Sequence, residues 1–251
     1  MIYFVGAGSG APDLITVRGA RLLSEADVIV YAGSLVNPAL LDYKKDGCEV
    51  YNSAKMTLEE VIAVMAPAAK AGKTVVRLHT GDPCVYGAHR EQMDELDRLG
   101  LAYEVCPGVS SFCGAAAALK AEYTLPNVSQ SVILTRMEGR TPVPEKEQIE
   151  AFAAHGATMV IFLSAGQLAR LSERLIAGGY APDTPAAIVY KATWPDEKVV
   201  RTTVADLAEA GAREGITKTA LITVGGFLGT EYERSRLYDP TFTTGFREAS
   251  R

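Results

Sequence analysis

The sequence has little of several features that mark common protein classes. Its four cysteines (Cys48, Cys84, Cys106 and Cys113) form no C-x-x-C pair and show no regular spacing, which indicates free thiols in a reducing compartment. It has no apolar run of about 18 residues, and its first residues lack the basic and long apolar regions of a signal peptide. We therefore expect a cytoplasmic protein that does not enter a membrane.

Positive charge and familiar catalytic motifs are also scarce. The net charge is −5 and the isoelectric point is near 5.4, which argues against a general nucleic-acid binder but permits a local basic cleft. The three histidines (His79, His89 and His155) have no zinc-binding spacing, and neither a G-x-S-x-G elbow nor a G-x-x-x-x-G-K-[ST] loop occurs. We expect no metal site and no nucleic-acid partner.

The chain does contain an alternation of short apolar strands and amphipathic helices. Continuous apolar runs bounded by Gly, Pro or Asp are typical of a parallel sheet that is buried on both faces. In the first half these runs are Ile2–Val5, Val28–Tyr31, Val50–Tyr51, Thr74–Leu78 and Tyr103–Val105. Between them, Thr16 is expected to cap one helix, and Thr57 with Glu60 forms a capping box for another that should stop near Gly72. Residues 1–118 therefore predict a doubly wound α/β domain.

The second half predicts another α/β domain. Residues 119–130 form an expected linker, residues 131–228 the domain, and residues 229–251 a tail without a clear period. The expected strands are Val132–Arg136, Met159–Leu163, Ala187–Tyr190, Val199–Thr203 and Leu221–Val224, and the expected helices are Glu145–Ala154, Gln167–Ala177 and Asp206–Glu214. We expect two α/β domains with mostly parallel and mixed sheets, and an active site in the cleft between them.

The opening loop "FVGAGSGAPDLIT" contains a possible dinucleotide-binding motif, because Gly6, Gly8 and Ala11 fit the pattern G-x-G-x-x-G/A. A Rossmann turn opens a helix directly and needs an acidic residue at the end of the next strand. Here the helix begins only after Thr16, and the next strand, "VIVYAGS", ends in small residues. We therefore expect no NAD or FAD, and glycines that let the loop lie flat beside either a large ligand or a neighbouring strand.

Two further loops follow strands of the first half. In "RLHTGDPCVYG", Asp82 either accepts hydrogen bonds from a ligand or closes an Asp-Pro turn that caps the next helix. In "CPGVSSF", Ser110 and Ser111 either cap the alanine-rich helix or face a ligand. Because parallel strands carry ligand loops at their carboxyl ends, two such loops at neighbouring strand ends predict a shared pocket.

Two segments of the second half concentrate positive charge. "LTRMEGRTPVPE" contains Arg136 and Arg140, and "VYKATWPDEKVVRTT" contains Lys191, Lys198 and Arg201. Guanidinium groups suit bidentate binding of carboxylates, so these segments indicate either a polyanionic small molecule or ordinary solvated loop charge.

Together these segments resemble the tetrapyrrole methylases, a family of S-adenosylmethionine-dependent enzymes with two α/β domains. The opening loop is similar to the family's first signature, with Ser9-Gly10-Ala11 in place of Pro-Gly-Asp, and "GDPCVYG" and "PGVSS" are similar to the second and third. The two basic segments resemble the branch that methylates a ring carbon of a tetrapyrrole in cobalamin biosynthesis. The resemblance extends from Met1 to Phe227, and we expect no counterpart for the tail.

The resemblance implies the ligands and their sites. S-adenosylmethionine would be the cofactor and S-adenosylhomocysteine its product, a tetrapyrrole with acetate and propionate side chains the substrate, and a second copy in a homodimer the partner. The implied cofactor positions are Pro12, Gly81, Asp82, Val85, Tyr86, Ser110, Ser111, Leu163 and Ala192. The expected substrate positions are Gly8, Ser9, Arg136, Arg140, Lys191 and Arg201. No residue stands out as a catalytic base, and Ala11 lacks the carboxylate that the family usually has there.

Two other interpretations stay open. One is a methylase of the same fold that acts on another ring position, on protein or on ribosomal RNA. The acidic balance and the two basic segments weigh against it. The other is a carrier that binds a tetrapyrrole without catalysis, and such a protein would not need the cofactor loops.

Overall fold

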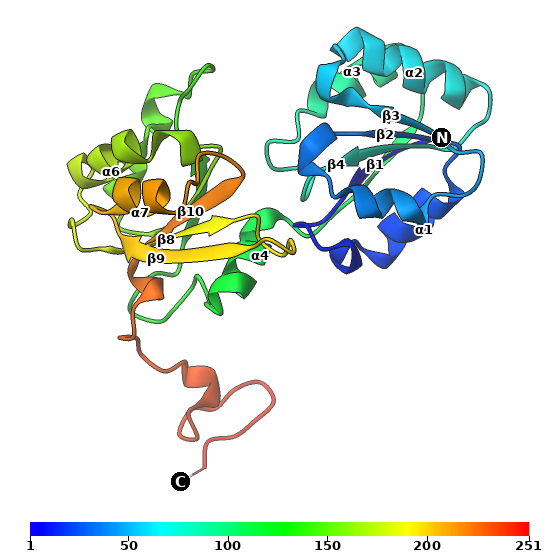
Figure 1. The fold of residues 1–251 in the computed structure, drawn as a ribbon. Coiled ribbons are helices and arrows are strands. Elements are labelled where there is room, and N and C mark those ends of the chain that lie inside the picture. The colour runs from blue at the N-terminus through cyan, green and yellow to red at the C-terminus, as the bar shows by residue number, and fades with distance from the viewer. Residues whose placement is uncertain (251) are drawn as a thin grey trace. The chain divides into compact units, whose positions relative to one another are not determined.

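The computed structural model describes residues 1–250, apart from the side chain of Ser34, and divides the chain into two compact units (Figure 1). The first unit contains residues 1–114 and 192–196, and the second contains residues 115–191 and the chain from 197 onward. Helix α4 (Ser111–Leu119) begins in the first and ends in the second. Within the described residues no helix has the length and apolar character needed to cross a membrane. The expected boundaries at residues 118, 130 and 228 stay predictions.

The first unit is built on a five-stranded parallel sheet with the order β3-β2-β4-β1-β5. Its strands are β1 (Ile2–Gly6), β2 (Val28–Tyr31), β3 (Glu49–Asn52), β4 (Val75–His79) and β5 (Tyr103–Cys106). Helix α1 (Val17–Glu25) covers one face, and α2 (Leu58–Lys70) and α3 (Arg90–Arg98) cover the other (Figure 1). The predicted α/β fold is confirmed for this part of the chain.

Both faces of this sheet are buried, which explains the continuous apolar runs of its strands. Ile2 and Phe4 of β1 pack in the cluster beneath α2 and α3, whereas Val5 packs in the cluster beneath α1. Because successive side chains of a strand point to opposite faces, a strand buried on both sides must be apolar at nearly every position.

The capping signals form as predicted. The Thr16 hydroxyl accepts a hydrogen bond from the Gly19 amide at 3.0 Å, so α1 begins well after the opening glycines. The Thr57 hydroxyl accepts from the Glu60 amide at 3.3 Å, and the Glu60 carboxylate accepts from the Thr57 amide at 2.7 Å. These bonds satisfy amides at the start of α2 that have no partner within the helix.

We expect Thr57→Ala to lower the free energy of unfolding by about 1 kcal/mol, because the Glu60 amide loses its acceptor. Urea denaturation followed by circular dichroism measures the change. Thr230→Ala is the matched control, since Thr230 is exposed and lies outside every helix and strand. Equal midpoints for the two variants would contradict the prediction.

The second unit contains a mixed sheet with the order β6-β7-β10-β8-β9. Its strands are β6 (Val132–Arg136), β7 (Thr158–Phe162), β8 (Pro185–Tyr190), β9 (Lys198–Thr203) and β10 (Ala220–Val224). Only the pair β6–β7 is parallel, and the other three pairs are antiparallel. The prediction of a mixed sheet is confirmed.

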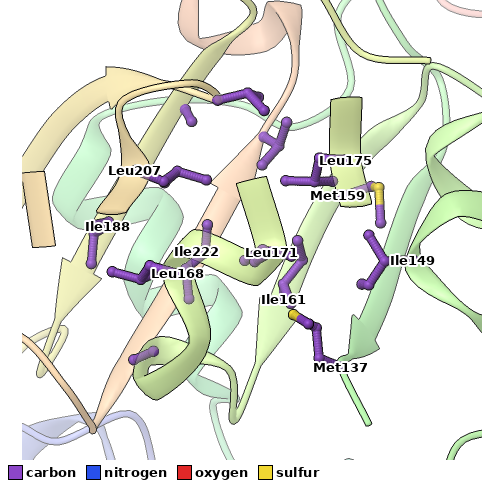
Figure 2. Packing of buried hydrophobic residues seen from close by; sticks show 14 of the residues in the cluster. Met137, Ile149, Met159, Ile161, Leu168, Leu171, Leu175, Ile188, Leu207 and Ile222 are labelled. Carbon is purple, nitrogen blue, oxygen red and sulfur yellow. The ribbon is translucent and has the colours of Figure 1, made fainter. Parts of the chain in front are cut away.

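Helices α5 (Ile149–Ala153), α6 (Leu168–Ala177) and α7 (Leu207–Arg213) belong to this unit. Figure 2 shows its apolar cluster, where Leu168 and Leu171 of α6 meet Ile161 of β7 and Ile222 of β10.

The expected helix over residues 145–154 is wrong in one respect. The chain forms a 3₁₀ turn at Glu145–Glu147, then an extended residue, Gln148, and only then α5. The extended backbone lets the Gln148 side chain accept a hydrogen bond from Arg174 at 2.8 Å, a tertiary contact that local propensity does not anticipate.

Candidate active site

Three loops of the first unit leave adjacent strands at the carboxyl edge of the parallel sheet. They are the opening loop after β1 (residues 7–16), the loop after β4 (residues 80–89) and the loop after β5 (residues 107–110). The expectation that the second and third loops follow neighbouring strands is wrong, because β1 lies between β4 and β5. The opening loop therefore occupies the middle position.

Glycines allow these three loops to meet backbone to backbone. A Cβ on Gly108 would lie 2.3 Å from the Gly81 carbonyl oxygen, and one on Gly6 would lie 2.6 Å from the Gly108 Cα. Gly8 and Gly81 exchange two hydrogen bonds, of 3.2 and 3.0 Å, between the first two loops. No side chain fits between these strands, so glycine is required by close approach. The expectation that the opening glycines let a loop lie against a neighbour is confirmed.

Asp82 joins the second loop to the third. Its Oδ1 accepts from the Cys84 amide and its Oδ2 accepts from the Gly108 amide, each at 2.8 Å. Partial burial opposes ionisation, but hydrogen bonds with the Cys84 side chain and with the Cys84 and Gly108 amides outweigh it and hold the pKa of Asp82 below its usual value. The turn does not cap a helix, since α3 begins only at Arg90.

The other predicted cofactor residues of this unit lie on the same loops. Gly81 has a φ of +60° and faces Ser110 and Ser111, whose nearest backbone atoms would lie 3.5–3.6 Å from its Cβ. The Ser110 carbonyl accepts from the Cys113 amide at 3.0 Å, so α4 starts directly after Ser110. Gly81, Asp82, Ser110 and Ser111 are thus brought together.

Val85 and Tyr86 follow Asp82 along the second loop. Val85 is half-buried, whereas the Tyr86 side chain is 45% exposed on a backbone with a φ of 56°. A left-handed backbone at a residue other than glycine costs about 1–3 kcal/mol and is concentrated at functional sites. Pro12 is half-buried and opens a 3₁₀ turn, Pro12–Leu14, in the opening loop.

The turn between β8 and β9 packs on the opening loop. The Thr193 hydroxyl lies 3.1 Å from the Ser9 hydroxyl and accepts from the Ala11 amide at 3.0 Å. A Cβ on Gly10 would lie 2.1 Å from Cδ1 of Trp194. The predicted site residues Gly8, Ser9 and Ala192 are all buried here.

Sequence reasoning missed Thr193 and Trp194. One feature of the sequence could have indicated them: the chain's single tryptophan lies in the basic segment "VYKATWPDEKVVRTT".

The predicted site residues of the second unit differ in what they contact. Leu163 directly follows β7 with a φ of 53° and is 67% exposed, which is unusual for a leucine. The Lys191 ammonium lies 5.4 Å from the centre of the Tyr190 ring, a cation–π arrangement. Arg201 donates to the Leu119 carbonyl at 2.8 Å and so caps the end of α4.

Arg136 and Arg140 belong to one loop but are used differently. The Arg136 guanidinium donates to the carbonyls of Met137, Thr141 and Pro142 at 2.8–3.3 Å. Arg140 is exposed, and within residues 1–250 it forms no hydrogen bond or ion pair. Of the predicted basic residues, Arg140 therefore has its guanidinium available for a ligand.

Two polar side chains of β4, Arg77 and His79, are buried at the base of the second loop. His79 is only 3% exposed, and burial together with nearby Arg77 lowers its pKa to about 3, so the ring is neutral. The ring forms a hydrogen bond with the backbone of Gly87, while its Nε2 has no partner. Burial lowers the pKa of Arg77 to about 10, and its Nε donates to Gln92 at 2.9 Å.

One hollow of the first unit lies away from these loops. It has a volume of about 520 Å³ and is lined by residues of α2 and α3, and none of the predicted site residues lines it. Across residues 1–250, no group of three or more His, Cys, Asp or Glu side chains is arranged to hold a metal ion.

Comparison with known proteins identifies the family. The family model of Tetrapyrrole (Corrin/Porphyrin) Methylases matches residues 1–208. The chain belongs to the tetrapyrrole methylase family. A cobalt-precorrin-4 C(11)-methyltransferase of Methanocaldococcus jannaschii is 54% identical over 249 residues, which cover 99% of this chain and 96% of that protein.

Two solved structures of tetrapyrrole methylases are also similar. A cobalt precorrin-4 methyltransferase has a TM-score of 0.89 and 51% identity, and the match covers 91% of this chain and 96% of that one. A uroporphyrin-III C-methyl transferase from Thermus thermophilus, complexed with S-adenosyl homocysteine, has a TM-score of 0.76 and 29% identity, covering 90% and 98%.

These findings confirm the resemblance and correct one expectation. The tail was expected to have no counterpart, but a match over 99% of the chain includes most of it. Periodicity missed this segment because it holds little regular structure, a 3₁₀ turn at Arg236–Tyr238 and a single bridge between Thr244 and Arg247. Site residues and the expected cleft between the domains stay predictions.

Proposed function

We propose that this tetrapyrrole methylase transfers a methyl group from S-adenosylmethionine to ring carbon 11 of precorrin-4 or cobalt-precorrin-4, giving precorrin-5 in cobalamin biosynthesis. The observation that carries the proposal is the 54% identity, over nearly the whole of both chains, to a cobalt-precorrin-4 C(11)-methyltransferase. The uroporphyrin-III enzyme shares the fold at only 29% identity, so a different ring position is the weaker alternative.

The first unit offers the proposed cofactor a charged group and an aromatic ring. Asp82 supplies an ionised carboxylate at the carboxyl edge of the sheet, next to Gly81, whose backbone groups bond to Gly8. Tyr86 supplies an exposed aromatic ring on the same loop. We propose these residues, with Pro12, Val85, Ser110, Ser111 and Ala192, as the cofactor-binding set of this unit. Leu163 stays a predicted contact in the second unit.

S-adenosylmethionine, when bound, supplies a methyl group on a positively charged sulfur. The chain's own task is then alignment, since holding reactants in position contributes several kcal/mol to catalysis. Asp82 attracts the positive charge, and its lowered pKa keeps it ionised at neutral pH. The bonds from Asp82 to the second and third loops keep those loops at a fixed separation.

Carboxylates of the substrate give the basic residues a role. We propose that Arg140 and Lys191 meet acetate or propionate groups, with Arg136 and Arg201 contributing the N–H groups that their backbone contacts leave unused. Gly8 and Ser9 of the opening loop complete the proposed substrate set.

We expect Arg140→Ala to raise the apparent KM for the tetrapyrrole about tenfold, because a hydrogen bond to a charged group is worth about 1.5 kcal/mol. The Kd for S-adenosylhomocysteine should not change. Steady-state kinetics and calorimetric titration measure the two quantities. Arg213→Ala, at an exposed arginine of α7, is the matched control. Equal weakening of both ligands by Arg140→Ala would remove the carboxylate assignment.

The proposed reaction is tested with S-adenosylmethionine that carries a ¹³C-labelled methyl group. The enzyme is incubated separately with precorrin-4 and with cobalt-precorrin-4, and NMR of the product locates the label. Labelling of carbon 11 supports the proposal, and the faster of the two substrates identifies the metal state. Label at another ring carbon, or tetrapyrrole binding without transfer, would overturn it in favour of another methylase or a carrier.

We also propose that the enzyme is a cytoplasmic homodimer. The four cysteines are free thiols in the structure, which agrees with a reducing compartment. Light scattering on the purified protein measures its mass, and a monomer at all concentrations would contradict the dimer.

A further inference from the structure

The loop that carries Arg140 is held by an ion-pair network. Arg174 of α6 has a nearly buried side chain, and its guanidinium contacts three other side chains. It donates to Glu138 of the loop, to Glu150 of α5, and to Gln148 just before α5. Exposed Arg170 of α6 also donates to Glu138. These contacts join α6, α5 and the loop through one group.

Hydrogen bonds between side chains and the backbone hold the same loop on both sides of Arg140. The Met137 amide donates to the Ser164 hydroxyl at 3.0 Å, and the side-chain amide of Gln167 donates to the Glu138 carbonyl at 3.3 Å. On the far side, Arg136 holds the carbonyls of Thr141 and Pro142. The loop is thus fixed at residues 137, 138, 141 and 142, whereas the Arg140 side chain is exposed and lies outside every one of these bonds.

Stability alone does not account for this network. Well-packed apolar side chains are often as stabilising as a buried ion pair, so such pairs are weak evidence for stability, and in some proteins they serve to fix a particular arrangement. Arg174 reaches two carboxylates and one amide, with Glu138 only two residues from Arg140. The hydrogen bonds from Arg174 lower the pKa values of Glu138 and Glu150, which keeps both of them charged.

We propose that Glu138, Arg174 and Gln167 are positioning residues for Arg140, and that they set the specificity of this methylase for a carboxylate-bearing tetrapyrrole. This inference rests on the proposed function. The network holds the loop in one arrangement before the substrate arrives, so that binding does not have to order it. A mobile loop would present the same guanidinium in many arrangements, and the apparent affinity would fall by the fraction that binds.

Glu138→Gln tests the inference, because it keeps the size of the side chain and removes its charge. We expect the apparent KM for the tetrapyrrole to rise about fivefold, with kcat and the Kd for S-adenosylhomocysteine unchanged. Gln167→Ala removes an independent hydrogen bond to the loop and should also raise the apparent KM for the tetrapyrrole. Glu173→Gln, at an exposed glutamate of the same helix, is the control. A fall in kcat at constant KM would indicate a purely structural role and overturn the inference.

A double-variant cycle shows whether Glu138 acts through Arg140. If it does, Glu138→Gln combined with Arg140→Ala should raise KM no further than Arg140→Ala alone, since interacting residues are not additive. Multiplicative effects would overturn the inference.

Hydrogen exchange of the peptide that covers residues 137–144 separates this inference from the proposed function, because it needs no substrate. Faster exchange in Glu138→Gln than in the wild type supports the positioning role even if precorrin-4 is not methylated, whereas unchanged exchange overturns it.

Discussion

Gly108→Ala should reduce the affinity for S-adenosylhomocysteine about a hundredfold and destabilise the first unit. The added Cβ would lie 2.3 Å from the Gly81 carbonyl oxygen and 2.7 Å from the Gly6 Cα. Both neighbours are backbone atoms in the central strand ends, so no side chain can rotate away. The third loop must move, and the 2.8 Å hydrogen bond from the Gly108 amide to Asp82 is lost with it.

The size of this effect follows from two contributions. Overpacking a tight site costs about 1–3 kcal/mol, and loss of a hydrogen bond to a charged group costs about 1.5 kcal/mol or more. About 2.8 kcal/mol corresponds to a hundredfold change in Kd.

Calorimetric titration measures the affinity of Gly108→Ala, and urea denaturation measures its stability. Gly245→Ala is the matched control, because a Cβ on Gly245 meets nothing within 4 Å. Wild-type affinity in Gly108→Ala would show that the close approach of these loops is not needed for the cofactor.

Asp82→Asn should weaken S-adenosylhomocysteine binding about tenfold and S-adenosylmethionine binding by more. The Cys84 and Gly108 amides both donate to the carboxylate at 2.8 Å, but a carboxamide offers only one acceptor oxygen. One amide then faces an NH₂ group, and a polar group left unsatisfied costs about 1–3 kcal/mol; a loss of about 1.4 kcal/mol, in the lower half of this range, corresponds to tenfold in affinity.

The two ligands separate the two roles proposed for Asp82. S-adenosylmethionine carries a positive sulfur, whereas the sulfur of S-adenosylhomocysteine is neutral, so loss of the carboxylate charge should affect only the former. Asp183→Asn, at an exposed aspartate, is the control. Equal losses for the two ligands would leave Asp82 as a link between loops and remove its electrostatic role.

The same variant should alter the response to acid. The pKa of Asp82 is lowered in the folded protein, so the unfolded chain binds the proton more readily. Its contribution to stability is therefore fully present above the usual aspartate pKa and is lost as the pH falls through the lowered value. Wild type should lose stability over this acidic range more steeply than Asp82→Asn, and urea midpoints across a pH series measure the difference. Parallel profiles would contradict this prediction.

Much of the local structure was predictable because it depends on neighbours in the chain. The Thr57–Glu60 capping box and the Thr16 cap form as their spacing indicates. The same spacing predicted that α1 begins only after Thr16, and it does, which is later than the helix that follows a dinucleotide turn. The helix expected from residue 145 failed because Gln148 turns to meet Arg174, 26 residues further along.

The candidate site was also predictable only in part. Asp82 and Ser110 were identifiable because polar residues after parallel strands follow a general rule for ligand loops. The connection between their loops was not predictable. Asp82 bonds to Gly108 only because the two loops leave β4 and β5 on either side of β1.

The sequence by itself determined the family, most of the strands and helices, and the polar loops from which we propose a site. These depend on residue type and on spacings of a few residues, which act locally. Only the tertiary structure decided the strand order, the packing of Trp194 against Gly10, and the network around Arg174. Those contacts join residues far apart in the chain, such as Arg174 and Glu138 at a separation of 36. Such partners are selected by the packing of whole elements, which no local pattern records.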